Sequence, residues 1–253
     1  MFPRLQKVVT AVALIGSIFL LWFIVTALGV DAIFVPTPQS VWKSFIAMSA
    51  NGLWTHLVIT SIRVLIAVAI SMLFAIPIAI VMYWNRTARL IISPIVDFIR
   101  YLPIPALIPL LILFLGIGES VKITVLFIGT FFQVVILVFD YLKNIHKEYY
   151  ELSYVFHSSR IKKWRMQISA IMPELWDTLR LSIGWCWTYI IIAELIATDL
   201  GIGRVIKEAQ RFSDSSRLYV AIILIGCVGL FIDQLMKYLA PKLFPYRYIQ
   251  IKT

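Results

Sequence analysis

Six long apolar runs restrict this chain to a fold that is built inside a lipid bilayer. A helix that crosses the hydrocarbon core needs about 20 predominantly apolar residues, and each run is close to that length. Because 61% of the 253 residues are hydrophobic and 14% are charged, a soluble domain of this size has no way to bury its apolar side chains. We therefore predict an all-α integral membrane protein, a single domain over residues 1–253, with about six transmembrane helices. The predicted spans are Val8–Val30, Leu57–Tyr83, Leu90–Leu115, Val121–Tyr141, Trp176–Ala197 and Leu218–Leu239.

The third run is the least regular of the six, because it carries four prolines. Pro94, Pro103, Pro105 and Pro109 each remove a backbone donor and crowd the preceding turn. Irregular backbone at membrane depth is tolerated only where it contacts protein or a water-filled path. We expect this span to be kinked or divided, and to line a polar pathway together with the fourth and fifth spans.

Lysine and arginine are distributed unevenly over the segments that connect the spans. With the N-terminus in the cytoplasm, fifteen of them fall in cytoplasmic segments and six in outer segments. Cytoplasmic loops carry the excess of positive charge, so both termini are predicted to be cytoplasmic. The first run is too long for a signal peptide and no small-residue cleavage pattern follows it, so we expect it to remain as a helix.

The longest cytoplasmic segment, residues 143–176, is polar and basic but has helical order. Apolar residues recur there at i, i+3 and i+7 in two groups: Tyr149, Leu152 and Phe156, then Ile161, Trp164 and Ile168. We predict two short amphipathic helices hinged near His157, with Ser159 as the N-cap of the second. Such a hairpin is typical of a docking element for a partner protein. The alternative is a surface helix on lipid, with its basic side chains at the headgroups.

Three charged residues lie at membrane depth, where a charge that faces lipid is costly. Asp97, Arg100 and Glu194 are therefore predicted to face the interior of the bundle. Arg100 suits an anionic solute, but an i, i+3 pair with Asp97 would satisfy both charges without a ligand. Glu194 is a candidate for stabilising an outer gate, with Arg204 as its suggested partner. Arg63 also falls within a span.

The outer segments are expected to form two short amphipathic helices, one around Trp42 and one over residues 205–212. Near the second helix, four basic residues are exceptions to the rule that positive charge is concentrated in cytoplasmic segments: Arg204, Lys207, Arg211 and Arg217. They suit an acidic partner surface or an anionic solute. The alternative is a solvated loop with local pairs to Glu208 and Asp214.

The sequence lacks motifs for catalysis, nucleotide binding and metal binding. It contains no GxxxxGK[ST] phosphate loop, and its three histidines form no HExxH pattern. Cys186 and Cys227 lie inside apolar runs and make no metal site. The net charge of +10 comes from basic residues at the ends of apolar runs, which is the pattern of topology determinants and not of nucleic-acid binding. We expect neither an enzyme nor a nucleic-acid-binding protein, and no cofactor or metal in this chain.

Residues 143–180 resemble the EAA loop of the permease subunits of binding-protein-dependent ABC importers. In that family a Glu-Ala-Ala helix is followed by a glycine turn, a second short helix and a Leu-Pro pair. Glu151-Leu152-Ser153 corresponds to the first element, and Met172-Pro173-Glu174-Leu175 to the last. Two positions depart from the pattern: Phe156-His157-Ser158 stands at the glycine hinge, and Ser169 at the earlier proline of the family's doubled pair.

Further segments resemble the branch of this family that carries nitrate, sulfonates, taurine and similar solutes. Residues 34–42 are similar to its outer Pro-Ser-Pro…Val-Trp segment, residues 100–110 to its Arg-Pro-Ile-Pro-Pro…Pro-Leu stretch, and residues 114–119 to a Phe-Gly-Ile-Gly turn. Residues 193–197, followed by Gly201-Ile202-Gly203, resemble its fifth-span signature. Together these segments cover residues 31–247, and their order and spacing support the resemblance.

The resemblance implies a type I ABC importer permease fold in a prokaryotic inner membrane. Its expected partners are a second permease copy, two ATP-binding subunits that hold ATP and Mg²⁺, an extracytoplasmic solute-binding protein and the bilayer. The 143–176 hairpin is expected to couple to the ATPase through Glu148, Glu151, Leu152, Phe156, His157, Ile161, Trp164 and Pro173. The residues expected along the translocation pathway are Asp97, Arg100, Pro103, Pro105, Gln133 and Glu194.

The implied function is import of a small anion such as nitrate, a sulfonate or taurine. The alternative is a secondary carrier or channel that needs no ATPase. A carrier would normally show repeated halves and buried titratable groups for ion coupling. The sequence shows neither feature, and a carrier would not explain the ordered hairpin.

Overall fold

The computed structural model describes residues 2–145, 160–196 and 200–248, and the regular structure of these residues is entirely helical. In chain order the helices are α1 (Phe2–Ala27), α2 (Pro38–Ala50), α3 (Leu53–Trp84), α4 (Arg86–Arg100), α5 (Ile104–Leu115), α6 (Glu119–Lys143), α8 (Arg160–Ala170), α9 (Met172–Ile196), α10 (Ile202–Arg211), α11 (Ser215–Leu243) and α12 (Pro245–Tyr248). The predicted all-α architecture is confirmed.

Four of the described helices are long and apolar enough to cross a membrane, namely α3, α6, α9 and α11. They match the second, fourth, fifth and sixth predicted spans. The third predicted span is a bent pair, α4 with α5, which makes a fifth crossing if it is counted as one. The first predicted span, Val8–Val30, overlaps α1 but extends beyond its end at Ala27; within this helix of 26 residues, Gly16–Ala27 is the described apolar part.

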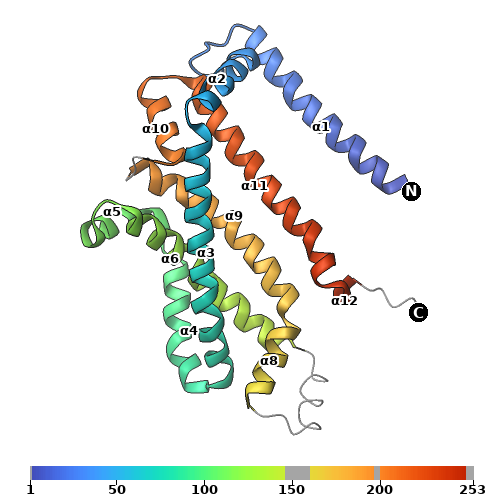
Figure 1. The fold of residues 1–253 in the computed structure, drawn as a ribbon, viewed down its shortest axis with the longest axis vertical. Helices are drawn as coiled ribbons and strands as arrows, with labels where there is room; N and C mark the ends of the chain where they lie inside the picture. The colour runs from blue at the N-terminus through green and yellow to red at the C-terminus, as the bar shows by residue number, and fades with distance from the viewer. Residues whose placement is uncertain (1, 146–159, 197–199, 249–253) are drawn as a thin grey trace.

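The prolines of the third span divide it, as predicted. The axes of α4 and α5 differ in direction by 101°, and Pro103 stands at the N-cap of α5. The residue before a proline is pushed out of the helical conformation, which ends α4 shortly before this point. As a result α5 projects sideways from the bundle (Figure 1) instead of continuing the direction of α4.

The core of the bundle is the long contact of α3 with α6, completed by α9 (Figure 1). Small residues at four-residue spacing on α3 are completely buried: Ala67, Ser71, Ala75 and Ala79. Small side chains allow membrane helices to approach closely. At mid-depth the hydroxyl oxygens of Ser71 and Thr130 lie 2.7 Å apart and share a hydrogen bond between α3 and α6. This core holds polar groups in place at both ends of the bundle.

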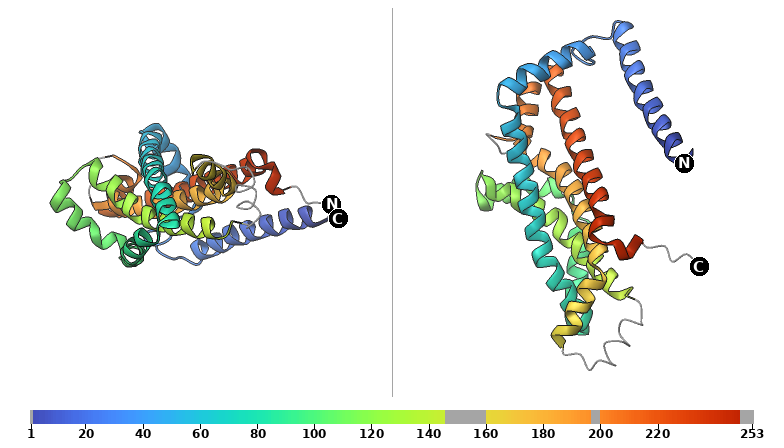
Figure 2. Two further views of the ribbon diagram at one scale, coloured as in Figure 1. Left: turned by 90° about the horizontal axis from the view of Figure 1, so that it is seen from below. Right: turned by 45° about the vertical axis from the view of Figure 1, so that its right-hand side comes forward.

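The helix predicted around Trp42 is α2, which lies across one end of the bundle. Thr37 caps it by accepting the backbone N–H of Ser40 on its hydroxyl at 3.2 Å. Helix α1 comes before α2 in the chain and lies largely apart from the other helices (Figure 2). Its C-terminal half is fastened where the Trp22 indole N–H donates to the Pro36 carbonyl at 2.9 Å and the ring stacks on Tyr219.

Candidate functional site

Polar side chains gather at both ends of the bundle, and the two ends carry different parts of the predicted machinery. The end with α8 contains the predicted coupling segment, whereas α2 and α10 lie at the opposite end (Figure 1). The predicted coupling residues Glu148, Glu151, Leu152, Phe156 and His157 lie outside the described residues. Helix α8 matches the second predicted helix of the hairpin and carries Ile161 and Trp164, the latter 38% exposed. Pro173 is buried in the first turn of α9.

Helix α8 is attached to the ends of both α3 and α9. The Trp84 indole N–H at the end of α3 donates to the Gln167 side-chain oxygen at 3.1 Å, and Gln167 is only 2% exposed. Ile171, directly after α8, and Leu175 on α9 are buried in the same apolar cluster as the last turns of α3 and α6. These contacts join α8 to two of the spanning helices.

Ion pairs join α9 to α11 and α12 near the same end. Arg180 on α9 binds Asp233 on α11 at 3.1 Å, and Arg247 on α12 binds Asp177 on α9 at 2.8 Å. Asp233 also accepts from Lys237 at 2.6 Å. These contacts link the C-terminal helix to α9, the helix that directly follows the coupling segment.

An ionic cluster that is buried except for one carboxylate joins four elements toward the α10 end of the bundle. We call it the Arg63 cluster, and its side chains are Thr60, Arg63, Glu119, Lys122 and Glu194. Arg63 on α3 donates to Glu119 at the start of α6 (2.6 and 2.5 Å), to Glu194 near the end of α9 (2.6 Å) and to the Leu200 carbonyl before α10 (2.7 Å). One guanidinium thus fixes the relative positions of α3, α6, α9 and the segment that leads into α10.

Glu194 is completely buried and its charge is fully met by donors. Besides Arg63, it accepts from the Thr60 hydroxyl at 2.9 Å and from the backbone N–H of Gly203 at 2.8 Å. The Thr60 oxygen in turn accepts the Ile202 N–H at 3.0 Å. A buried carboxylate is tolerated only with such pairing. The ion pair of Glu194 is with Arg63 and not with the suggested Arg204, which binds Glu208 at 2.7 Å.

Two glycines let the chain pass directly over the Glu194 side chain. A Cβ atom at Gly201 would lie 2.4 Å from the Glu194 carboxylate, and φ there is +127°, a conformation that L side chains rarely adopt. A Cβ at Gly203 would lie 2.3 Å from the Glu194 Cβ and 3.0 Å from its backbone carbon. The Gly-Ile-Gly sequence is thus required by a close approach of α10 to the end of α9.

Gly203→Ala is expected to destabilise the protein by about 1–3 kcal/mol, the usual cost of overpacking a buried contact. The added methyl group meets backbone atoms, so α9 and α10 must separate and strain the Glu194 hydrogen bonds. The midpoint of thermal unfolding in nanodiscs measures the effect. Gly184→Ala is the matched control, because nothing lies within 4 Å of its Cβ position. Equal midpoints for the two variants would contradict the close approach.

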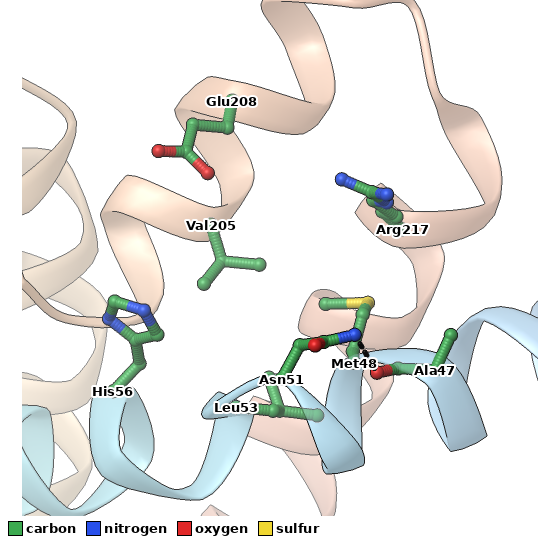
Figure 3. A pocket seen from close by; sticks show the side chains of 8 residues that line it. All are labelled: Ala47, Met48, Asn51, Leu53, His56, Val205, Glu208 and Arg217. Carbon is green, nitrogen blue, oxygen red and sulfur yellow. Dashed lines mark hydrogen bonds between the residues drawn. The ribbon is translucent and has the colours of Figure 1, made fainter.

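A pocket of about 330 Å³ opens beside this cluster between α2, α3, α10 and α11 (Figure 3). Its polar lining consists of Asn51, His56, Glu208 and Arg217. His56 also supports the turn before α10, since its Nδ1 accepts the Gly201 N–H at 3.0 Å. Arg204 pairs with Glu208 and Arg217 with Asp214, which are the local pairs considered above for this basic segment.

The predicted pathway residues are spread over several elements. Asp97 and Arg100 end α4 and form the predicted i, i+3 pair at 3.5 Å. The predicted interior position holds for Glu194, which is buried, but Asp97 and Arg100 are both exposed on the surface of this chain. Pro103 and Pro105 flank the start of α5, and Gln133 is half-buried on α6.

Arg100→Ala is expected to change the KM for uptake by less than about threefold, because an exposed ion pair contributes only about 0–1 kcal/mol. Arg100 already has Asp97 and the Tyr101 hydroxyl as partners, the latter at 3.0 Å. Uptake of labelled solute by the assembled transporter measures the effect. A tenfold or larger rise in KM would instead place Arg100 on the solute path, since a hydrogen bond to a charged group contributes about 1.5–3 kcal/mol.

Sequence reasoning missed most of the Arg63 cluster. The rule that selected Asp97, Arg100 and Glu194 applied equally to Arg63, a cation ten residues inside α3, but no local partner drew attention to it. Its partners come from α6 and α9 and are 56 and 131 residues away in the chain. The sequence feature that could have identified the cluster was Arg63 itself, a charge at membrane depth with no acidic residue one helical turn away.

Residues 67–245, from within α3 to the first residue of α12, match the family described as the inner membrane component of binding-protein-dependent transport systems. The chain belongs to this family. It is therefore the permease subunit of an ABC importer, a multi-pass inner-membrane protein and not a catalytic ATPase. The family implies ATPase and binding-protein partners.

Relatives and solved structures support the same assignment. The chain is 29% identical to the putative aliphatic sulfonates transport permease protein SsuC of Bacillus subtilis strain 168, covering 91% of this chain and 84% of that protein. It is 25% identical to the taurine transport system permease protein TauC of Escherichia coli K12, covering 97% and 92%. The fold resembles a chain of the inward-facing MetNI methionine ABC transporter, with a TM-score of 0.67, 15% identity and coverage of 76% and 94%. The predicted type I importer permease fold is confirmed.

Proposed function

We propose that this permease imports a small organic sulfonate, such as taurine or an alkanesulfonate, with energy from ATP hydrolysis in partner subunits. The observation that carries this proposal is the similarity to permeases named for aliphatic sulfonates and for taurine, over 91% and 97% of this chain. These solutes share a sulfonate group that is anionic at neutral pH. Nitrate and other small anions are the nearest alternatives within the same class.

The proposed assembly contains two copies of this chain, two ATP-binding subunits and an extracytoplasmic solute-binding protein. ATP and Mg²⁺ are held by the ATP-binding subunits, since this chain has no phosphate loop. Both termini and the 143–176 segment lie in the cytoplasm, and α2 and α10 lie on the outer side. The pocket lined by His56 and Arg217 then faces the solute-binding protein.

The coupling segment converts ATPase closure into movement of the spanning helices. Glu148 and Glu151 supply charge and Leu152, Phe156 and Trp164 supply apolar contact at the docking surface. When ATP draws the two ATPase subunits together, α8 moves with them. The Trp84–Gln167 hydrogen bond and the buried contact at Ile171 pass this movement to α3 and α9, which tilt from an inward-open to an outward-open arrangement.

Receptor-stimulated ATP hydrolysis tests the solute class. The complete importer is placed in nanodiscs, and its solute-binding protein is added empty or loaded with taurine, methanesulfonate, nitrate or a neutral amide of similar size. We expect the sulfonate-loaded receptor to stimulate hydrolysis most strongly. Stimulation by the neutral solute alone, or by none of these solutes, would contradict the proposal.

A further inference from the structure

Glu119 is held by two buried cations in the geometry that an external oxyanion would adopt. Arg63 donates two parallel N–H groups to it, Nε to Oε2 at 2.6 Å and Nη2 to Oε1 at 2.5 Å. The Lys122 ammonium donates to the same Oε1 at 2.8 Å. A bidentate arginine contact supplemented by a lysine is a recurrent way of binding carboxylates and other oxyanions in proteins.

The three side chains differ sharply in exposure. Those of Arg63 and Lys122 are 5% and 4% exposed, whereas that of Glu119 is 58% exposed. The carboxylate therefore lies between the two buried cations and the surface of this chain. Glu119 begins a membrane-spanning helix, and a carboxylate facing lipid would be costly, so the exposed side of Glu119 is assigned to water or to the path of the solute.

We propose that Arg63 and Lys122 form a binding site for the anionic group of the transported solute, and that Glu119 occupies this site when solute is absent. The inference rests on the proposed function, which makes the solute a sulfonate. Glu119 then competes with the solute for Arg63 and Lys122, and the arriving solute displaces the Glu119 carboxylate toward water. The site is reset when solute leaves and Glu119 returns.

The charge balance of the Arg63 cluster favours such an exchange. Two cations, Arg63 and Lys122, are matched by two carboxylates, Glu119 and Glu194. Glu194 is completely buried and stays bound to Arg63, Thr60 and the Gly203 N–H. Withdrawal of Glu119 alone leaves one uncompensated positive charge, which the single negative charge of a sulfonate group balances.

The stereochemistry favours a sulfonate over a carboxylate. Oε1 of Glu119 must now accept from both Arg63 Nη2 and Lys122 Nζ, because a carboxylate has only two oxygens. A sulfonate has three oxygens, so two can accept the parallel N–H groups of Arg63 while the third accepts from Lys122. A neutral solute of similar shape lacks the charge that desolvated cations require.

The test measures binding of methanesulfonate to the assembled permease–ATPase complex in nanodiscs, without the solute-binding protein, by isothermal titration calorimetry. Glu119→Gln removes the tethered anion, and tethering supplies an effective concentration in about the millimolar range or above. We therefore expect Glu119→Gln to tighten methanesulfonate binding by at least about tenfold over wild type. Adding Lys122→Met to Glu119→Gln should reverse most of this gain.

Asp140→Asn is the control, since Asp140 forms an exposed carboxylate–lysine pair at the other end of α6. It should leave methanesulfonate affinity unchanged. If Glu119→Gln does not assemble, Glu119→Asp is titrated instead; its shorter arm should give a smaller gain in affinity. The inference is overturned if the assembled Glu119 variant shows no gain in affinity, if Asp140→Asn gives an equal gain, or if Lys122→Met leaves the gain intact. Receptor-stimulated ATP hydrolysis by the wild-type importer tests the proposed function separately. If sulfonate-loaded receptor stimulates hydrolysis but Glu119→Gln does not tighten methanesulfonate binding, the inference fails and the proposed function stands.

Discussion

Replacing Arg63 with methionine is expected to lower the free energy of unfolding of the permease by about 3–5 kcal/mol, the cost of leaving one member of a buried ion pair without its partner. The side chain of Arg63 is 5% exposed and that of Glu194 is completely buried. Glu194 would keep Thr60 and the Gly203 N–H but lose its counter-charge. The midpoint of thermal unfolding of the assembled protein in nanodiscs measures the loss.

Two companion variants separate this effect from a general loss of charge. Arg204→Met breaks an exposed arginine–glutamate pair, which contributes only about 0–1 kcal/mol, and should unfold close to the wild-type midpoint. Combining Arg63→Met with Glu194→Met should recover much of the stability, because an apolar pair of similar volume can replace a buried ion pair. Equal midpoints for Arg63→Met and Arg204→Met would show that the Arg63 cluster does not hold the helices together.

Glu151→Arg is expected to reduce ATP-coupled uptake by more than about tenfold, because reversing a charge at a docked, desolvated contact costs several kcal/mol. Glu151 stands at the glutamate of the EAA pattern, in the segment that we propose docks to the ATPase. Uptake of labelled taurine and copurification of the ATP-binding subunit are measured together. Both should fall, while the amount of permease in the membrane stays unchanged.

Asp140→Arg provides the control for Glu151→Arg. Asp140 lies in the last turn of α6, just before the coupling segment, and its side chain is 52% exposed with only a 4.0 Å pair to Lys143. The same reversal of charge there should leave ATPase copurification nearly intact. Normal uptake in Glu151→Arg would remove the docking role of residues 143–176.

The helices whose positions depend on interactions within one segment of the chain could be predicted from the sequence. Apolar runs of membrane length gave α3, α6, α9 and α11, and the prolines at 103 and 105 gave the division of the third span. The short helices predicted around Trp42 and over residues 205–212 correspond to α2 and α10. In each case the deciding interaction lies within one helix or its cap, where sequence spacing reports geometry directly.

The Arg63 cluster was not predictable in the same way. Which acidic residue a buried arginine meets depends on how α3, α6 and α9 pack, and no pattern within α3 contains that information. The direction of the α4–α5 bend is a similar case: the prolines required a break, but the angle of 101° and the exposed position of Arg100 follow from tertiary packing. For the same reason the partner suggested for Glu194 was Arg204, the nearest outer cation in the sequence. The packing of the helices brings Arg63 to Glu194 instead.

ATP-driven import is tested most directly by uptake of labelled taurine into proteoliposomes that contain the complete importer with its loaded solute-binding protein. ATP is placed on the side of the ATP-binding subunits in one preparation and is absent from the other. We predict accumulation with ATP and none without it or without the ATP-binding subunits. Uptake that persists when those subunits are left out would identify a carrier that works alone and would rule out ATP-driven import.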